Sequence, residues 1–123
     1  MVLRQLAYIE GNAYKISTSI SFINNNLCEY LAIEELAKSI NMSVSSFHKH
    51  FKALISVSPL QYIKIQRLHK AKKLMLSSNM DITGACYHVG YQSASQFSRE
   101  YSKYFGITPS LDIKNIKKNW SKS

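Results

Sequence analysis

The 123-residue chain carries 16 Lys and Arg residues against 7 Asp and Glu, a formal charge of +9 at pH 7. This excess favours an anionic partner, nucleic acid first and a membrane surface second. The two cysteines, Cys28 and Cys86, stand alone, which excludes a disulfide framework and a CxxC zinc site. No apolar run approaches the ~18 residues of a membrane span.

The N-terminal 40 residues predict two helices. Residues 1–12 are mixed in character and fit either a linker or a brief helix. From residue 13 onward, apolar side chains recur at helical spacing up to Leu27. Residues 31–40 predict a second, shorter helix, which Ala32 cannot cap although Glu35 stands where a capping-box acid would. The apolar positions of the two helices are Ile16, Ile20, Ile23 and Leu27, then Ile33, Leu36, Ala37 and Ile40.

A tight turn at Asn41-Met42 leads into a helix over residues 43–54, with Ser43 as its N-cap. Helix, turn and helix form the helix-turn-helix outline, over residues 32–55, in which the second helix enters the DNA major groove. Its inward face is predicted to be Phe47, Phe51 and Leu54. Its outward face is Ser45, His48, Lys49 and Lys52.

The longest predicted helix covers residues 59–76 and begins at the Ser58-Pro59 cap. At ~1.5 Å per residue it would be roughly 27 Å long. Neighbouring major-groove segments on one DNA face are ~34 Å apart, so such a rod could carry two recognition helices. Its predicted core side chains are Leu60, Ile63, Leu68, Ala71, Leu74 and Met75, with Lys64, Arg67, Lys70, Lys72 and Lys73 more exposed.

A second unit repeats the first at an offset of 50 residues, since the segment 93–101 matches 43–51 and 107–109 matches 57–59. It covers residues 81–105: Asp81 caps a helix to His88, and Gly90 makes a turn one residue longer than the first. The next helix begins at the Ser93 cap and ends at Gly106. Its inward face is Phe97, Tyr101 and Phe105, its outward face is Ser95, Gln96, Arg99 and Lys103, and Glu100 is expected at the rim. A last helix from Thr108-Pro109 to residue 116 precedes a basic tail, 117–123.

These motifs resemble the DNA-binding region of the AraC/XylS family of bacterial transcription regulators. The resemblance covers residues 13 to about 113. Its most specific part is Gly90-Tyr91, Ser93, Phe97-Ser98-Arg99, Tyr101, Phe105-Gly106 and Thr108-Pro109. Asp112-Ile113 stands where the family signature has Tyr-Arg, and Ser56 stands where the family has Gly.

The resemblance implies an all-α fold of about seven helices, in which a long linker helix joins two helix-turn-helix units. The domain would occupy residues 13–116, after a linker or interdomain remnant at 1–12. The implied function is sequence-specific binding of double-stranded DNA for transcription regulation in the bacterial cytoplasm. RNA polymerase is a further expected partner, and an N-terminal domain would supply effector binding and dimerisation. No cofactor is expected.

Residue roles follow from position in the family motif. Arg99 can fork onto guanine and Gln96 can pair with adenine, while Ser or His can contact either base. The residues expected to face bases are Ser45, His48, Lys49, Ser95, Gln96 and Arg99. Those expected at the DNA backbone are Ser43, Lys52, Ser93, Lys103, Lys64 and Arg67, although Arg67 could instead pin the two units together.

Rival functions find less support in the sequence. No nucleophile stands with a base, no Gly-rich phosphate loop occurs and no carboxylates are paired, so an enzyme is not indicated. His48 and His50 diverge on a helix and cannot chelate one metal together. Nonspecific DNA or RNA binding by a basic helical module is the alternative that stays open, although exposed aromatic platforms for RNA are missing.

Overall fold

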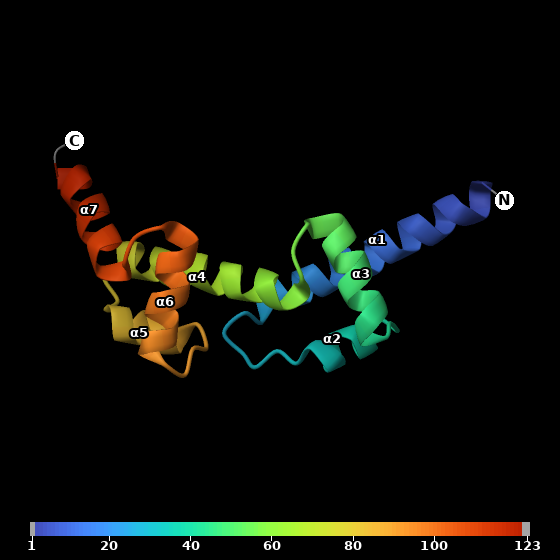
Figure 1. The fold of residues 1–123 in the computed structure, drawn as a ribbon, viewed down its shortest axis with the longest axis horizontal. Helices are drawn as coiled ribbons and strands as arrows, with labels where there is room; N and C mark the ends of the chain where they lie inside the picture. The colour runs from blue at the N-terminus through green and yellow to red at the C-terminus, as the bar shows by residue number, and fades with distance from the viewer. Residues whose placement is uncertain (1, 122–123) are drawn as a thin grey trace. The chain divides into compact units, whose positions relative to one another are not determined.

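The computed structural model describes residues 2–121, which form helices and connecting turns without a strand (Figure 1). The chain divides into two compact units after Lys64. This confirms the predicted all-α class and the two helix-turn-helix units. The helices are α1 (Val2–Asn25), α2 (Ile33–Ser39), α3 (Val44–Ile55), α4 (Pro59–Ser77), α5 (Ile82–His88), α6 (Ala94–Phe105) and α7 (Pro109–Ser121).

The core of the first unit is built from α1, α2, α3 and the start of α4. Phe47 and Phe51 of α3 are fully buried and pack edge to face, with ring centroids 5.6 Å apart. Ile63 of α4 joins the same cluster. The rest of the cluster comes from α1, α2 and the residue that follows each of them closely in the chain: Ile16, Ile23, Leu27, Leu36, Ala37 and Ile40, of which Leu27 and Ile40 lie just beyond the helix ends.

Helix α1 includes residues 2–12, for which the sequence left a linker or a brief helix open. It runs from Val2 to Asn25 without interruption, so residues 2–12 are helical and continue the helix expected from residue 13. In Figure 1 its N-terminal half projects beyond α2 and α3 of the same unit. No break marks residue 12, and the domain boundary placed there stays a prediction.

The second unit repeats this arrangement around a separate core. Phe97 and Tyr101 of α6 are fully buried, together with Ala85 and Cys86 of α5. Leu68, Ala71 and Met75 of α4 complete the cluster, and Phe105 packs partly buried at its edge. Helix α4 therefore begins in the first unit and ends in the second, as expected of the linker helix.

Two predicted core positions are wrong. Leu54 is 51% exposed and Leu60 is 50% exposed. At the end of α3 the inward direction belongs to Ile55, which packs against the core, and in the first turn of α4 it belongs to the buried Pro59. Each predicted leucine stands one residue away from the side chain that the core takes.

The last helix is longer than the sequence predicts. Helix α7 reaches Ser121 instead of residue 116. Lys117 Nζ donates to Asn79 Oδ1 at 2.9 Å, which ties the additional turn of α7 to the loop after α4. Of the predicted tail, residues 122 and 123 lie outside the described residues.

Candidate nucleic-acid interface

Helix α3 is held so that one face is buried and the other is free. The Ser43 hydroxyl accepts a hydrogen bond from the Ser46 amide at 3.1 Å, which confirms the predicted N-cap. At the other end, Ser56 adopts the left-handed conformation with φ of 78°. Between these caps the core aromatics fix the rotation of the helix. The exposed face consists of Ser45, His48, Lys49 and Lys52, as predicted.

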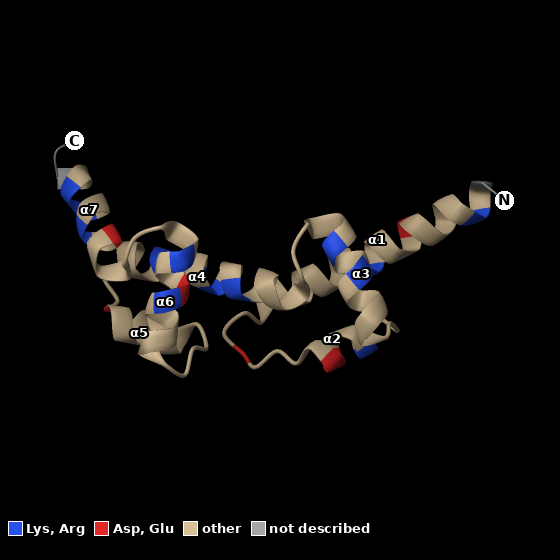
Figure 2. Ribbon diagram, in the orientation of Figure 1, with Lys and Arg blue, Asp and Glu red and all other residues tan. Residues whose placement is uncertain are grey.

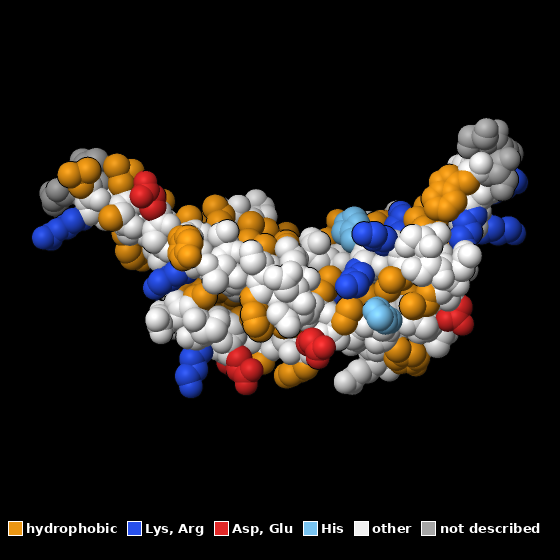
Figure 3. Space-filling model, turned by 180° about the vertical axis from the view of Figure 1, so that it is seen from behind, with side chains coloured by type: hydrophobic (Ala, Val, Ile, Leu, Met, Phe, Trp, Pro, Cys, Tyr) orange, Lys and Arg blue, Asp and Glu red, His pale blue; other side chains and the backbone are white. Residues whose placement is uncertain are grey.

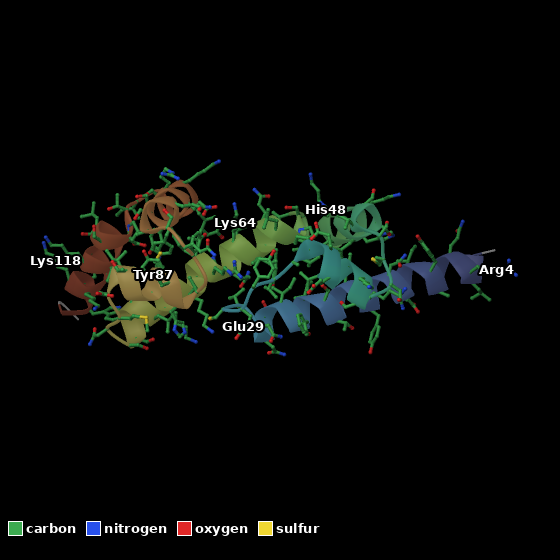
Figure 4. The ribbon with its side chains drawn as sticks, turned by 90° about the horizontal axis from the view of Figure 1, so that it is seen from below. Arg4, Glu29, His48, Lys64, Tyr87 and Lys118 are labelled. Carbon is green, nitrogen blue, oxygen red and sulfur yellow. The ribbon has the colours of Figure 1, made fainter. Side chains whose placement is uncertain are left out.

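The exposed face of α3 has no acidic residue, and Figure 2 shows blue segments but no red on this helix. His48 lies on it at the periphery of the first unit (Figure 4). These exposed side chains have no carboxylate on their own helix to pair with. Their hydrogen-bond donors can therefore contact an acceptor outside the protein. This is the property that a surface for DNA requires.

Helix α6 of the second unit is capped at both ends and oriented by its buried face in the same way as α3. The Ser93 hydroxyl accepts from the Gln96 amide at 3.2 Å, and Gly106 ends the helix in the left-handed region at φ of 77°. Phe97 and Tyr101 hold the buried side. The exposed side consists of Ser95, Gln96, Arg99 and Lys103.

The two turns that precede these helices differ as expected. Asn41 takes a positive φ of 57° in the first turn and Gly90 one of 99° in the second. A Cβ atom on Gly90 would lie 3.3 Å from Cζ of Arg67, so the guanidinium group packs directly beneath this turn. Arg67 is half-buried. This position favours a structural role for Arg67 at the second turn rather than a contact with phosphate. Arg67 and the turn belong to the same unit.

Glu100 is half-buried and stands next to the exposed Arg99 on α6. Its Oε2 atom is buried, so part of the carboxylate is turned toward the interior. Burial, and then the charge of Glu100, raise the pKa of Tyr91 above its ordinary value. Arg99 and Lys103 are therefore the exposed charged residues of α6.

A buried polar contact on the core side of α6 links this helix to α7 and α4. The sequence did not predict it. The hydroxyl of Tyr101 donates to Asp112 Oδ2 of α7 at 2.7 Å, and Lys72 Nζ of α4 lies 3.1 Å from the same oxygen. Burial, and then the hydrogen bond to Asp112, raise the pKa of Tyr101, so its hydroxyl stays protonated and donates. Lys72 also lies over the ring of Phe105, 4.4 Å from the centroid.

Between residues 2 and 121 no group of three or more His, Cys, Asp and Glu side chains could hold a metal ion. The ring of His50 is hydrogen-bonded to Asn12 and Ser46, and that of His69 to Tyr104. Within the same residues, no helix is long and apolar enough to cross a membrane.

Comparison with known proteins identifies the arrangement. Residues 36–114 match the model of a helix-turn-helix domain family. The chain is 32% identical over 95 residues to the lactose operon transcription activator of Staphylococcus xylosus, which covers 77% of this chain and 34% of that protein. It is also 32% identical over 93 residues to an uncharacterised helix-turn-helix transcriptional regulator, YobQ, of Bacillus subtilis, covering 76% and 39%. The chain thus spans little more than a third of these curated relatives.

Solved structures agree on the fold. An AraC-type regulator from Chromobacterium violaceum superposes with a TM-score of 0.78 at 25% identity, over 85% of this chain and 94% of that chain. The DNA-binding domain of AdpA, crystallised with a target DNA, gives 0.82 at 20% identity, over 88% and 97%. The family match, the relatives and the paired helix-turn-helix units together show that the chain belongs to the AraC/XylS family and corresponds to the DNA-binding domain of that family.

Proposed function

We propose that this domain binds double-stranded DNA in a sequence-specific manner and regulates transcription. The observation that carries the proposal is the paired construction of α3 and α6. Each helix begins at a serine cap, buries two aromatic side chains and exposes short polar and basic side chains on its outer face. A helix of this form fits the major groove, where base edges present donors and acceptors. The kinship with transcription regulators supports the same function.

Base contacts are assigned to the outer faces. Arg99 suits guanine, whose O6 and N7 accept the two donors of a guanidinium fork, and Gln96 suits adenine. Ser95 completes this set on α6, and Ser45, His48 and Lys49 form the corresponding set on α3. A good bidentate contact discriminates against the wrong base by about 1–3 kcal/mol.

Contacts with the DNA backbone are assigned to residues beside these sets. Lys52 and Lys103 are exposed at the far ends of the recognition helices and can reach phosphates. The hydroxyls of Ser43 and Ser93 already serve as N-caps. The N-termini of α3 and α6 would therefore bind phosphate through their backbone amides. Lys64 and Arg67 are half-buried and take part in other interactions, which makes them the weakest members of this set.

The two recognition helices are not identical, so one chain is expected to select an asymmetric site of about two turns of duplex. Selection from random duplexes, followed by sequencing, tests this. An enriched motif with two distinct halves is the expected result. Binding without an enriched motif, with an affinity that follows only the salt concentration, would instead support the alternative of nonspecific nucleic-acid binding.

The wider role of the protein rests on its family. We propose that it acts in the bacterial cytoplasm as a regulator without enzymatic activity. RNA polymerase is proposed as a second partner, and effector binding and dimerisation are proposed for a domain N-terminal to these residues, as the resemblance implies. A pull-down of RNA polymerase by the DNA-bound chain would test the first of these partners.

A further inference from the structure

The internal repeat places different side chains behind the two recognition helices. At the offset of 50 residues, Phe51 of α3 corresponds to Tyr101 of α6, and both side chains are fully buried. Tyr62 of α4 corresponds to Asp112 of α7. The AraC/XylS signature also has a tyrosine where this chain has Asp112, so the carboxylate is a departure of this chain. An aromatic pair in the first unit is therefore replaced by a phenol and a carboxylate in the second.

A third position extends this correspondence to the helix that precedes each helix-turn-helix. Asn24 of α1 directly follows a buried core residue, and Lys72 of α4 does the same. The core positions around these two residues keep one spacing at an offset of 48 residues: Ile20, Ile23 and Leu27 in the first unit, and Leu68, Ala71 and Met75 in the second. Asn24 and Lys72 therefore occupy equivalent places in the two units.

Ring packing connects the three positions in the first unit. The ring of Tyr62 meets that of Phe51 nearly edge to face, with centroids 5.5 Å apart. The hydroxyl of Tyr62 donates to Asn24 Oδ1 at 3.1 Å, but this hydrogen bond is exposed and water competes with it. On this side, α3 therefore rests mainly on an aromatic contact.

A charged contact connects the three positions in the second unit. The Tyr101 hydroxyl donates to Asp112 Oδ2 at 2.7 Å, and Lys72 Nζ lies 3.1 Å from the same oxygen. Asp112 is buried in the first turn of α7, where a helix N-terminus favours negative charge. Hydrogen bonds to a charged group are shorter and stronger than neutral ones, and they weaken steeply when the angle is poor. Tyr101, Asp112 and Lys72, here called the polar cluster, thus hold α6 by directional contacts.

Lys72 contacts protein groups on two sides. Figure 3 shows Lys and Arg side chains that stand out from the surface of one face of the molecule. The Lys72 side chain is only 26% exposed, and its amino group lies 4.4 Å from the ring centroid of Phe105 as well as against Asp112. Phe105 is the last residue of α6. Lys72 therefore joins α4 to both α6 and α7.

The polar cluster lies behind the base-facing side of α6. Tyr101 stands two positions after Arg99, which is about 200° around the helix. A side-chain tip lies about 6 Å from the helix axis, so a rotation of α6 by about 10° moves it by about 1 Å. Donor–acceptor distances in hydrogen bonds span only about 2.7–3.2 Å, so such a shift breaks a bidentate contact with a base. The contact that fixes Tyr101 therefore also fixes where Arg99 points.

We propose that Lys72 and Asp112 are positioning residues for base readout by α6. The inference rests on the proposed function, since it names the groups that orient the second recognition helix for DNA. Neither residue touches the DNA: they hold Tyr101, and Tyr101 holds the helix. A buried charged pair of this kind contributes to a single defined arrangement more than to net stability. The polar cluster acts on the half of the DNA site that α6 reads and leaves the half read by α3 unchanged.

Binding to variants of the selected duplex tests this role. Dissociation constants are measured for the selected site and for duplexes with one base pair changed in either half, and Arg99→Ala identifies the half that α6 reads. Lys72→Met removes the amino group and keeps the length of the side chain. Its discrimination against changed base pairs in the α6 half is expected to fall about three- to tenfold, as for a contact with a base that is lost or misaligned. Discrimination in the other half should stay as in the parent.

Two further substitutions of lysine separate position from charge. Lys72→Arg keeps a cation within reach of the carboxylate and is expected to retain the discrimination of the parent. Lys73→Met is the matched control, because Lys73 is the next residue of α4, is exposed and carries the same charge. Its loss is expected to weaken binding to all duplexes alike and to leave discrimination in both halves unchanged.

Asp112→Asn guards against loss of folding. It keeps the shape of the side chain and an acceptor for Tyr101, so its far-UV circular dichroism at the assay temperature should match the parent, while discrimination in the α6 half falls as in Lys72→Met. Folded variants Lys72→Met and Asp112→Asn that discriminate like the parent would overturn the inference, and so would equal losses in both halves. A parent chain that selects no motif at all would contradict the proposed function itself.

Discussion

Replacing Asp112 by alanine is expected to destabilise the second unit through a residue on a different helix. The fully buried hydroxyl of Tyr101 donates to Asp112 Oδ2 at 2.7 Å, and Lys72 Nζ lies 3.1 Å from the same atom. Asp112→Ala removes the acceptor while Tyr101 stays inside the core of α6. The buried hydroxyl then loses its hydrogen-bond partner.

The expected loss is set mainly by this hydroxyl. A hydrogen bond to a charged group contributes about 1.5–3 kcal/mol, a range that includes the cost of leaving its buried donor unpaired. The ion pair with Lys72 adds less than about 1 kcal/mol, because the lysine side chain is 26% exposed and water screens the pair. We therefore expect the free energy of unfolding to fall by about 2–3 kcal/mol.

Urea unfolding followed by far-UV circular dichroism measures this loss, and a double-mutant cycle assigns it. Tyr101→Phe removes the donor without leaving an unpaired group in the core. In Tyr101→Phe/Asp112→Ala neither partner remains, so the double variant should be no less stable than Asp112→Ala alone, with a coupling energy of at least about 1 kcal/mol. The reasoning is refuted if Asp112→Ala costs less than about 0.5 kcal/mol or if the two effects simply add.

Other substitutions test the recognition faces and the turns. Arg99→Ala should relax the selected base at one position of the binding site, whereas Lys103→Ala should weaken binding to all sequences alike, as repeated random-site selection and titration would show. Gly90→Ala should destabilise the chain more than Gly106→Ala in thermal unfolding, because both have positive φ but only Gly90 has side-chain atoms close to the added carbon. Ser43→Ala should cost about 1 kcal/mol in urea unfolding through the lost cap, and no loss would count against the cap geometry.

Sequence alone was sufficient for the local features that residue types fix directly. Ser43, Ser93 and Asp81 act as N-caps at the predicted positions, each accepting from the amide three residues on. Asn41 and Gly90 make the two turns with positive φ. These outcomes were predictable because each depends on a few neighbouring atoms: a short side chain that reaches its own backbone, or a missing Cβ.

The recognition faces belong to the same class of prediction. Ser95, Gln96 and Arg99 are exposed because Phe97 and Tyr101 occupy the opposite side of one short helix. The spacing of apolar residues fixes which side faces the core, and the rest of the helix surface follows from it. Their assignment to bases or phosphates stays a prediction.

Only the tertiary structure decided where side chains at the margins of a helix go. Leu54 and Glu100 stand beside buried positions, and their directions depend on what packs against the helix from elsewhere in the chain: α1 beside Leu54, and the second-unit core beside Glu100. The contact between Tyr101 and Asp112 spans two helices and has no spacing rule that would reveal it. Periodicity describes one helix at a time, whereas these side chains respond to neighbours that the fold brings from other segments.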